Sequence, residues 1–326
     1  MNGTNATATL RHMDCIAGMR EHISDDSIHL TVTSIPFEEL FTYSGQAADV
    51  GNNGSTVNIR LGRFALNMRF VVAELFRVTA PGCNVCIHIQ QLLAYKVQHG
   101  FMGRRDFRGA MVDVFRAGGF HFSGDFAIQK NPQAMAQRKQ LHSLMFITGK
   151  RNATMLAPRP NDYVLIFQKP GECKHPVRAI HDDDQNPGGW LSTDEWIRDA
   201  HGIWTDIQEI DVLDGWKAAR ESNEEKHVCP LQLSVIYRMV RLYTNPISIQ
   251  PDAIVLDPFM GIGSTAFVCL GGRCQDGALT FDHRRHVVGF ELKESYYNQS
   301  LRNVEKAKRQ CWKTDDTLHP LFAGMK

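Results

Sequence analysis

VLDPFMGIGST, residues Val255 to Thr265, is the stretch that decides the fold. Its apolar start is typical of a buried strand, and a turn containing Gly261 and Gly263 leads into a helix that we expect Ser264 or Thr265 to cap. Glycines let the backbone come close to a ligand, and a helix start offers unpaired N–H groups. A tight strand-to-helix turn without a ligand would look the same, so this stretch alone leaves both interpretations open.

The next predicted strand, HVVGFEL, ends in a carboxylate, Glu291. A carboxylate at this place can accept hydrogen bonds from the ribose hydroxyls of a nucleoside. An ordinary surface glutamate is the alternative. The segment between the two strands, residues 271–285, is longer than a tight crossover needs, and we interpret its second half as an exposed insertion.

Predicted strands and helices alternate along the rest of the chain. Apolar residues at helical spacing predict helices over residues 62–79 and 231–243, the first ending at Ala-Pro-Gly, and a last helix that extends to about Lys308. Shorter apolar segments between helices predict strands, including one over residues 84–92. This alternation predicts a doubly wound α/β sheet, in which ligands bind beyond the carboxyl ends of the strands. Three such ends stand out: TSIPF (33–37), LDPFMGIGS (256–264) and GFELK (289–293).

Composition excludes several classes of protein. The chain has 326 residues, 43% of them apolar and 22% charged, as in a soluble globular protein. No apolar run approaches the roughly 20 residues that span a bilayer, and the first residues lack the plan of a signal peptide, so we expect a cytoplasmic protein. The eight cysteines are irregularly spaced and no HExxH-like pair occurs, so we predict neither a disulfide scaffold nor a metal site.

Charge is distributed unevenly although the net charge is only +1. Residues 127–161 contain no acidic side chain, whereas residues 181–225 are rich in them. A solvated face is the ordinary explanation, and a phosphate-binding groove is the other. The basic residues that we select as candidate DNA contacts are Arg138, Lys139, Lys150 and Arg151.

Taken together, these motifs resemble those of the DNA amino-methyltransferases, in the permuted order that puts the catalytic motif before the cofactor motif. The family's catalytic motif, Ser/Asn/Asp-Pro-Pro-Tyr/Phe, is matched by Ser34-Ile35-Pro36-Phe37, and its cofactor loop by Asp257 to Ser264. MDCIAGM (13–19) and KHVCPLQL (226–233) resemble two further family segments, and the likeness is greatest to the branch found in phages and prophages. The resemblance implies S-adenosylmethionine as cofactor, bound by Asp14, His227, Asp257, Pro258, Phe259, Gly261, Gly263, Ser264 and Glu291.

The resemblance also implies a mechanism. The family methylates the exocyclic amine of adenine (N6) or cytosine (N4) after the base is flipped out of the duplex. Ser34 Oγ and the carbonyl of Ile35 would accept the two amine hydrogens, and Phe37 would stack on the base. Serine in the first place of the motif leans towards cytosine N4. The family normally has proline where this chain has Ile35, so we expect methyl transfer to be retained but slowed.

The implied organisation is a Rossmann-like, circularly permuted class I methyltransferase sheet with an irregular insertion. Residues 1–171 would form the catalytic half, 172–225 an inserted target-recognition subdomain and 226–326 the cofactor half. Double-stranded DNA is the implied partner, with no membrane and no metal, and a homodimer is one candidate assembly. A role in a restriction pair or in protecting a phage genome is left open. Two alternatives also remain: an inactive protein that binds DNA or cofactor, and an amino-methyltransferase acting on RNA or on a protein amide.

Overall fold

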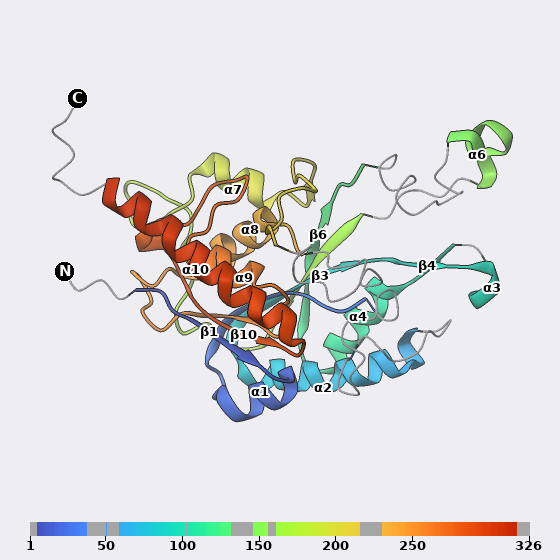
Figure 1. Ribbon diagram of the computed structural model, residues 1–326, viewed down its shortest axis with the longest axis horizontal. Helices are drawn as coiled ribbons and strands as arrows, with labels where there is room; N and C mark the ends of the chain where they lie inside the picture. The colour runs from blue at the N-terminus through green and yellow to red at the C-terminus, as the bar shows by residue number, and fades with distance from the viewer. Residues whose placement is uncertain are drawn as a thin grey trace.

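A sheet of eight strands forms the centre of the protein (Figure 1). The computed structural model describes residues 5–37, 50, 59–101, 103–131, 146–155, 161–215 and 230–317. Neighbouring strands are parallel from β1 through β10, β9 and β2 to β3. The next strand, β7, is antiparallel to both of its neighbours, β3 and β6. In order across the sheet the strands are β1 (Ala8–His12), β10 (His286–Glu291), β9 (Ile254–Asp257), β2 (Ile28–Ser34), β3 (Thr79–Gln90), β7 (Asp162–Gln168), β6 (His121–Ile128) and β8 (Ile203–Trp204).

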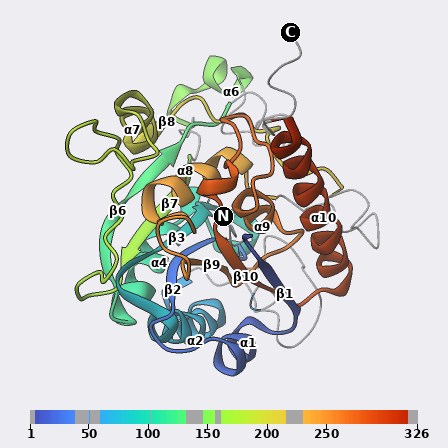
Figure 2. The ribbon, with the colours of Figure 1, turned by 90° about the vertical axis from the view of Figure 1, so that its left-hand side faces the viewer.

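Helices cover both faces of this sheet, which confirms the predicted doubly wound architecture (Figure 2). On one face lie α1 (Cys15–His22), α2 (Arg63–Val78) and α4 (Phe107–Ala117); on the other lie α8 (Leu233–Tyr243), α9 (Ser264–Cys269) and α10 (Glu294–Thr317). The apolar residues of α2 recur at helical spacing, and this stripe packs on the sheet. Alternate residues of the strands enter the two cores: Val85 and Ile87 face α2, whereas Cys86 faces the side of α8.

Two predicted boundaries are wrong. The helix predicted over 62–79 stops where expected, since α2 ends at Val78, but β3 begins at once at Thr79 rather than at Asn84. Gly82 makes this continuation feasible: its φ of 73° is one that glycine adopts readily, and its N–H donates to the carbonyl of Lys169 at 2.9 Å. The last helix also extends to Thr317, beyond the predicted end at Lys308.

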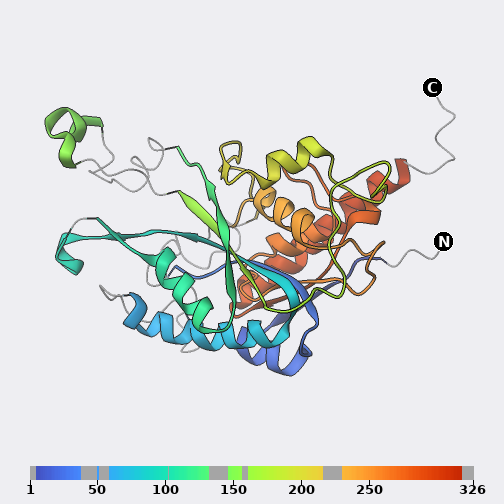
Figure 3. The same cartoon turned by 180° about the vertical axis from the view of Figure 1, so that it is seen from behind.

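Two projections extend from the body on the same side (Figures 1 and 3). One is the hairpin of β4 (Leu92–Ala94) and β5 (Gly103–Arg105), which carries α3 (Lys96–His99). The other carries α6 (Phe146–Arg151) and the short turn η5 (Ala153–Met155). The hairpin follows the carboxyl end of β3, and the second projection precedes the start of the antiparallel β7. Both therefore begin at the sheet edge where β2 ends. Two other single-turn helices are η3 (Ile59–Leu61) and η6 (Phe281–His283).

The described part of the predicted insertion, residues 172–215, has more regular structure than expected. It contains α7 (Thr193–Ala200), whose start is closed by a capping box between Ser192 and Glu195, and the short strand β8, which pairs with β6. Trp190 is buried and its indole N–H donates to the carbonyl of Arg241 on α8 at 2.9 Å. This segment is therefore anchored on α8.

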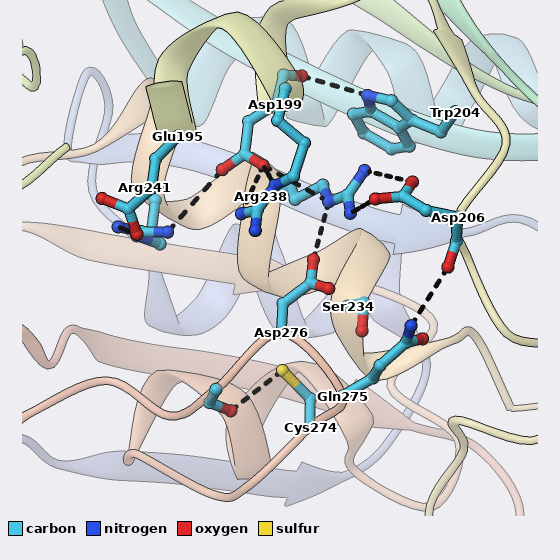
Figure 4. Close-up of polar contacts among 12 residues, drawn as sticks. Glu195, Asp199, Trp204, Asp206, Ser234, Arg238, Arg241, Cys274, Gln275 and Asp276 are labelled. Atoms are coloured by element: carbon cyan, nitrogen blue, oxygen red, sulfur yellow. Dashed lines mark hydrogen bonds and ion pairs between the residues drawn. The ribbon is translucent and has the colours of Figure 1, made fainter. Parts of the chain in front are cut away.

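A buried ion cluster strengthens this anchor (Figure 4). Arg238 of α8 is completely buried and contacts three carboxylates, Asp206 at 2.6 Å, Asp276 at 2.7 Å and Asp199 at 3.4 Å. Its guanidinium carbon also lies 5.2 Å from the centre of the Trp204 ring. Burial alone would lower the pKa of Arg238, but the hydrogen bonds to Asp206 and Asp276 outweigh it and raise that pKa. The cluster therefore fixes 172–215 and the α9–β10 connection on one helix.

Candidate active site

Asp257, at the end of β9, joins the two predicted motifs. Its buried carboxylate accepts hydrogen bonds from Thr33 Oγ1 and Thr265 Oγ1, each at 2.6 Å, and from the backbone N–H of Phe259 at 3.2 Å. Thr33 directly precedes Ser34, and β2 pairs with β9 in parallel. The motif over 34–37 and the loop that begins at Asp257 therefore leave the same sheet edge side by side.

Burial also raises the pKa of Asp257 to about 6, despite the hydrogen bonds from Thr265, Thr33 and Phe259 that lower it. Because the folded pKa exceeds the unfolded one, this group stabilises the fold below about pH 4, and the stabilisation is lost as the pH rises through about 6. We expect the unfolding free energy of wild type, relative to Asp257→Asn, to fall by about 2 kcal/mol between pH 4.5 and 7.5. Urea unfolding at both pH values measures this, and an unchanged difference would contradict it.

The predicted glycine turn has the backbone conformation that requires glycine. The φ angles are +56° at Gly261 and +87° at Gly263. Gly263 is the N-cap of α9, which corrects the expected cap: Ser264 is buried, and Thr265 bonds Asp257 instead. No described atom would lie within 4 Å of a Cβ added to Gly261, so the backbone faces open space there.

Two carboxylates lie beside this turn. Glu291 ends β10, and its carboxylate accepts from the N–H groups of Gly261 and Lys293, both at 2.8 Å. Asp14 follows the neighbouring strand β1, where its side chain caps α1 by accepting from Ile16 and Ala17 at 3.0 Å. Met13 N–H bonds the Glu291 carbonyl at 3.0 Å, which ties the two strand ends together. Pro258 is buried and Phe259 is half-buried in the same turn.

The predicted catalytic motif, residues 34–37, begins at the last residue of β2. Ser34 is half-buried, and its Oγ lies 3.0 Å from His88 Nδ1 on β3. Ile35 is only 2% exposed and its side chain belongs to the core beneath α2, whereas Pro36 is buried and Phe37 half-buried. The Phe37 ring lies edge-on to His88, with centroids 6.0 Å apart. An apolar side chain at position 35 therefore has a packing role here.

Sequence reasoning missed the residues behind Ser34. His88 Nε2 lies 3.3 Å from Asp162 Oδ2 at the start of β7, and the same oxygen lies 2.9 Å from Lys130 Nζ after β6. Gln90 Nε2 donates to the other oxygen of Asp162 at 2.8 Å. Burial alone would raise the pKa of Asp162, but its contacts with His88 and Lys130 lower it to about 2, so the carboxylate is ionised.

The remaining predicted residues lie elsewhere. Lys150 and Arg151 are exposed on α6, in the second projection. Arg138, Lys139 and His227 lie outside the described residues. Within the described ranges, no group of three or more His, Cys, Asp and Glu side chains could hold a metal ion. No helix in that part of the chain has the length and apolar character needed to cross a bilayer.

Comparison with known families identifies this arrangement. The model of the DNA methylase family, N6_N4_Mtase, matches residues 28–302. The chain belongs to the DNA methylase family. Members of this family transfer methyl groups to DNA from S-adenosylmethionine, so the enzyme class and the cofactor implied by the sequence motifs are confirmed at this level.

Relatives of the methylase agree with this assignment. Over 115 residues it is 36% identical to YubD of Escherichia coli (strain K12), a protein named as a methylase; the alignment covers 34% of this chain and 41% of YubD. The chain thus matches less than half of that relative's length.

Two solved structures share the fold of the methylase. TTHA0409 from Thermus thermophilus, named as a DNA modification methylase and complexed with S-adenosyl-L-methionine, aligns with a TM-score of 0.60 and 18% identity over 93% of this chain and 94% of its own. PvuII DNA methyltransferase, named as cytosine-N4-specific, aligns with a TM-score of 0.59 and 14% identity over 95% and 94% of the two chains.

The residues of the glycine turn fit S-adenosylmethionine. None of the described residues occupies the space beside the Gly261 backbone. The Glu291 carboxylate next to it can accept hydroxyl hydrogens, since each carboxylate oxygen accepts more than one hydrogen bond. The end of β1, with Asp14, borders the same place. This loop and these two acidic side chains would hold the donor.

Proposed function

We propose that this methylase transfers a methyl group to the exocyclic amine of a base in double-stranded DNA, with cytosine N4 as the first candidate and adenine N6 as the second. The observation that carries the proposal is the 2.6 Å hydrogen bond between Thr33 and Asp257, because it puts Ser34 next to the loop that would hold the methyl donor. The permuted order of motifs belongs to the same proposal: β2 precedes β9 in the chain and neighbours it in the sheet.

The chemistry follows from the weakness of the nucleophile. An amine conjugated to a heteroaromatic ring is a poor nucleophile, because its lone pair is delocalised into the ring. Ser34 Oγ and the carbonyl of Ile35 would accept both amine hydrogens and draw the nitrogen towards tetrahedral geometry. S-adenosylmethionine supplies the electrophilic methyl group when bound. Proximity and placed acceptors, rather than a covalent enzyme intermediate, would carry the catalysis.

A flipped base would enter beside Phe37. Unstacking and unpairing a base costs a few kcal/mol, and stacking on an aromatic side chain returns about 1–3 kcal/mol. Phe37 is half-buried, and its orientation is fixed from two sides, by His88 and by Phe107 at a centroid distance of 6.3 Å. Its place as the last residue of the predicted catalytic motif suits Phe37 to hold the base.

Methyl transfer tests the proposal directly. Purified protein is incubated with isotopically labelled S-adenosylmethionine and unmethylated duplex DNA, and the digested nucleosides are separated by mass spectrometry. Label in N4-methylcytosine or N6-methyladenine supports the proposal and identifies the base. Binding of the cofactor without label in any DNA would favour the inactive alternative, and activity of Ile35→Pro alone would assign the loss to the loop. Preferred labelling of RNA or protein would favour the alternative of an amino-methyltransferase that acts on RNA or on a protein amide.

Phosphate contacts are proposed for α6. Lys150 and Arg151 are exposed at the tip of a projection that begins at the same sheet edge as Ser34. Each phosphate contact adds about one unit to the dependence of log affinity on log salt concentration. We expect Lys150→Gln with Arg151→Gln to reduce the magnitude of that slope by about 2.

The matched control is Lys308→Gln with Arg309→Gln, an exposed pair of the same composition on α10 at the other end of the molecule (Figure 1). Binding of duplex DNA is measured by fluorescence anisotropy across a salt series. If the salt dependence of DNA affinity is the same in both double variants, α6 does not contact DNA phosphates. A cytoplasmic location, and a role in restriction or in protecting a phage genome, remain parts of the same proposal.

A further inference from the structure

Ser34 is the first member of a buried polar chain that crosses four strands. Ser34 is paired in register with His88 on β3, Gln90 with Asp162 on β7, and Lys130 follows the end of β6. The contacts run from Ser34 Oγ to His88 Nδ1 at 3.0 Å, from His88 Nε2 to Asp162 Oδ2 at 3.3 Å, and from Lys130 Nζ to that oxygen at 2.9 Å. The side chains of His88, Asp162 and Lys130 are all more than nine-tenths buried.

The direction of each hydrogen bond in this chain follows from an ionised Asp162 and a neutral His88. Asp162 is ionised and can only accept, so Nε2 of His88 must carry a hydrogen. When His88 is neutral, its other nitrogen has no hydrogen, so His88 Nδ1 accepts and Ser34 donates its hydroxyl hydrogen to it. The Ser34 oxygen is thereby left with lone pairs directed at an incoming donor.

We propose that His88, held by Asp162 and Lys130, is a positioning residue that makes Ser34 an acceptor for the amine and receives through it the proton that the amine loses. This inference rests on the proposed function. An amine offers hydrogens and needs acceptors. A serine free to rotate could equally donate its own hydrogen, which would leave the amine hydrogen unpaired.

The proton transfer balances without any further reactant. The amine lone pair forms the new N–C bond, and the broken C–S bond leaves its electron pair on sulfur. The nitrogen, now positively charged, passes one hydrogen to Ser34 Oγ while the Ser34 hydroxyl hydrogen passes to His88 Nδ1. His88 becomes an imidazolium paired with Asp162, and it returns that proton to water after the product leaves.

The side chains that surround His88 come from each neighbouring strand. Ser34 faces it from β2, Asp162 from β7 and Lys130 from the end of β6, and the ring of Phe37 lies against its edge. Gln90, on the same strand, also bonds Asp162. One carboxylate and one ammonium thus accompany the imidazole, and protonation of His88 would turn Nδ1 into a donor towards Ser34.

The tautomer can be observed without any turnover. In protein labelled with ¹⁵N-histidine at pH 7.5, two-bond nitrogen–proton correlations should show His88 protonated at Nε2 and unprotonated at Nδ1, with the assignment made by loss of the signals in His88→Phe. A hydrogen on Nδ1 would overturn the proposal. This measurement gives the same answer whether or not the protein methylates DNA.

Kinetics supply the second test. In His88→Phe, which keeps an aromatic ring and leaves Asp162 paired with Lys130, we expect the single-turnover rate to fall about 10²-fold with cofactor affinity unchanged. In His88→Asn, whose amide oxygen can accept from Ser34 without titrating, we expect a smaller loss and no decline of the rate on the acid side of the wild-type profile. The exposed His121→Phe serves as control and should match wild type.

The outcomes separate the two proposals. Two results with an active wild type would overturn the role of His88 and leave the methyltransferase function intact. One is a single-turnover rate in His88→Phe equal to that of wild type. The other is a rate in His88→Asn that declines at acid pH as the wild-type rate does. No methyl transfer by wild type to any DNA would overturn the function itself, and the tautomer measurement would then still decide the hydrogen-bond direction. Circular dichroism and cofactor binding show whether His88→Phe folds. If it does not fold, the kinetics of His88→Asn and the tautomer measurement decide the role of His88.

Discussion

Glu291→Ala should weaken binding of S-adenosylmethionine by about 10²- to 10⁴-fold. Two hydrogen bonds from ribose hydroxyls to a carboxylate contribute about 1.5–3 kcal/mol each, and all of this is lost when the carboxylate is removed. The same side chain accepts from Gly261 N–H at 2.8 Å, so its removal also releases the turn that would carry the donor. Isothermal titration calorimetry with S-adenosylmethionine measures the effect.

Glu294→Ala is the matched control, because Glu294 is exposed at the start of α10, only three residues along the chain. It should leave cofactor affinity unchanged. Glu291→Gln, which retains one acceptor oxygen, should lie between the two. If Glu291→Ala binds as tightly as wild type while remaining folded, the carboxylate has no part in the cofactor site and serves only to shape the glycine turn.

Arg238→Leu should lower the free energy of unfolding by about 3–5 kcal/mol. The substitution removes the cation that Asp199, Asp206 and Asp276 share. The largest cost falls on Asp276, which is 6% exposed and loses its ion pair with Arg238, because an uncompensated buried charge is strongly destabilising. Asp199 retains Arg198 at 2.7 Å, and Asp206 is 45% exposed to solvent. The guanidinium also packs on Trp204, and that contact is lost too. Urea unfolding at pH 7.5 measures the change.

Arg116→Leu makes the same chemical change at an exposed position of α4 and should stay within about 0.5 kcal/mol of wild type. Adding Asp276→Asn to Arg238→Leu should recover part of the loss, because it removes one of the stranded charges. A loss below about 1 kcal/mol for Arg238→Leu would mean that solvent reaches the cluster and screens it.

The sequence was most informative where one short segment dictates its own conformation. Gly261 and Gly263 both have left-handed φ angles, as a strand-to-helix turn that approaches a ligand requires. The apolar stripe of 62–79 and the run of 231–243 correspond to α2 and α8 within one or two residues at each end. The capping box of α7 was also present in the sequence as Ser192-x-x-Glu195, and the weak periodicity after it concealed the helix.

The contacts of Ser34 with His88, and of His88 and Lys130 with Asp162, could not be predicted, because they depend on which strands are neighbours in the sheet. Val32, Cys86, Val164 and Ile128 all face the same core, and on each strand the next residue on that face, at the edge where β2 ends, is polar: Ser34, His88, Asp162 and Lys130. Alternation along one strand gives the face of a residue but not its cross-strand partner. Only the observed order β2-β3-β7-β6 shows that these four polar ends meet.

The order of the strands also bears on how the protein is made. Thr7 bonds His286 across 279 positions of sequence, and β9, which flanks β2, is synthesised only after residue 253. Until β9 has left the ribosome, the edge of β2 that pairs with β9 is open. An open strand edge can pair with strands of other chains and lead to aggregation. Nascent chains stalled before Ile254 should therefore depend on chaperones far more than the finished enzyme does.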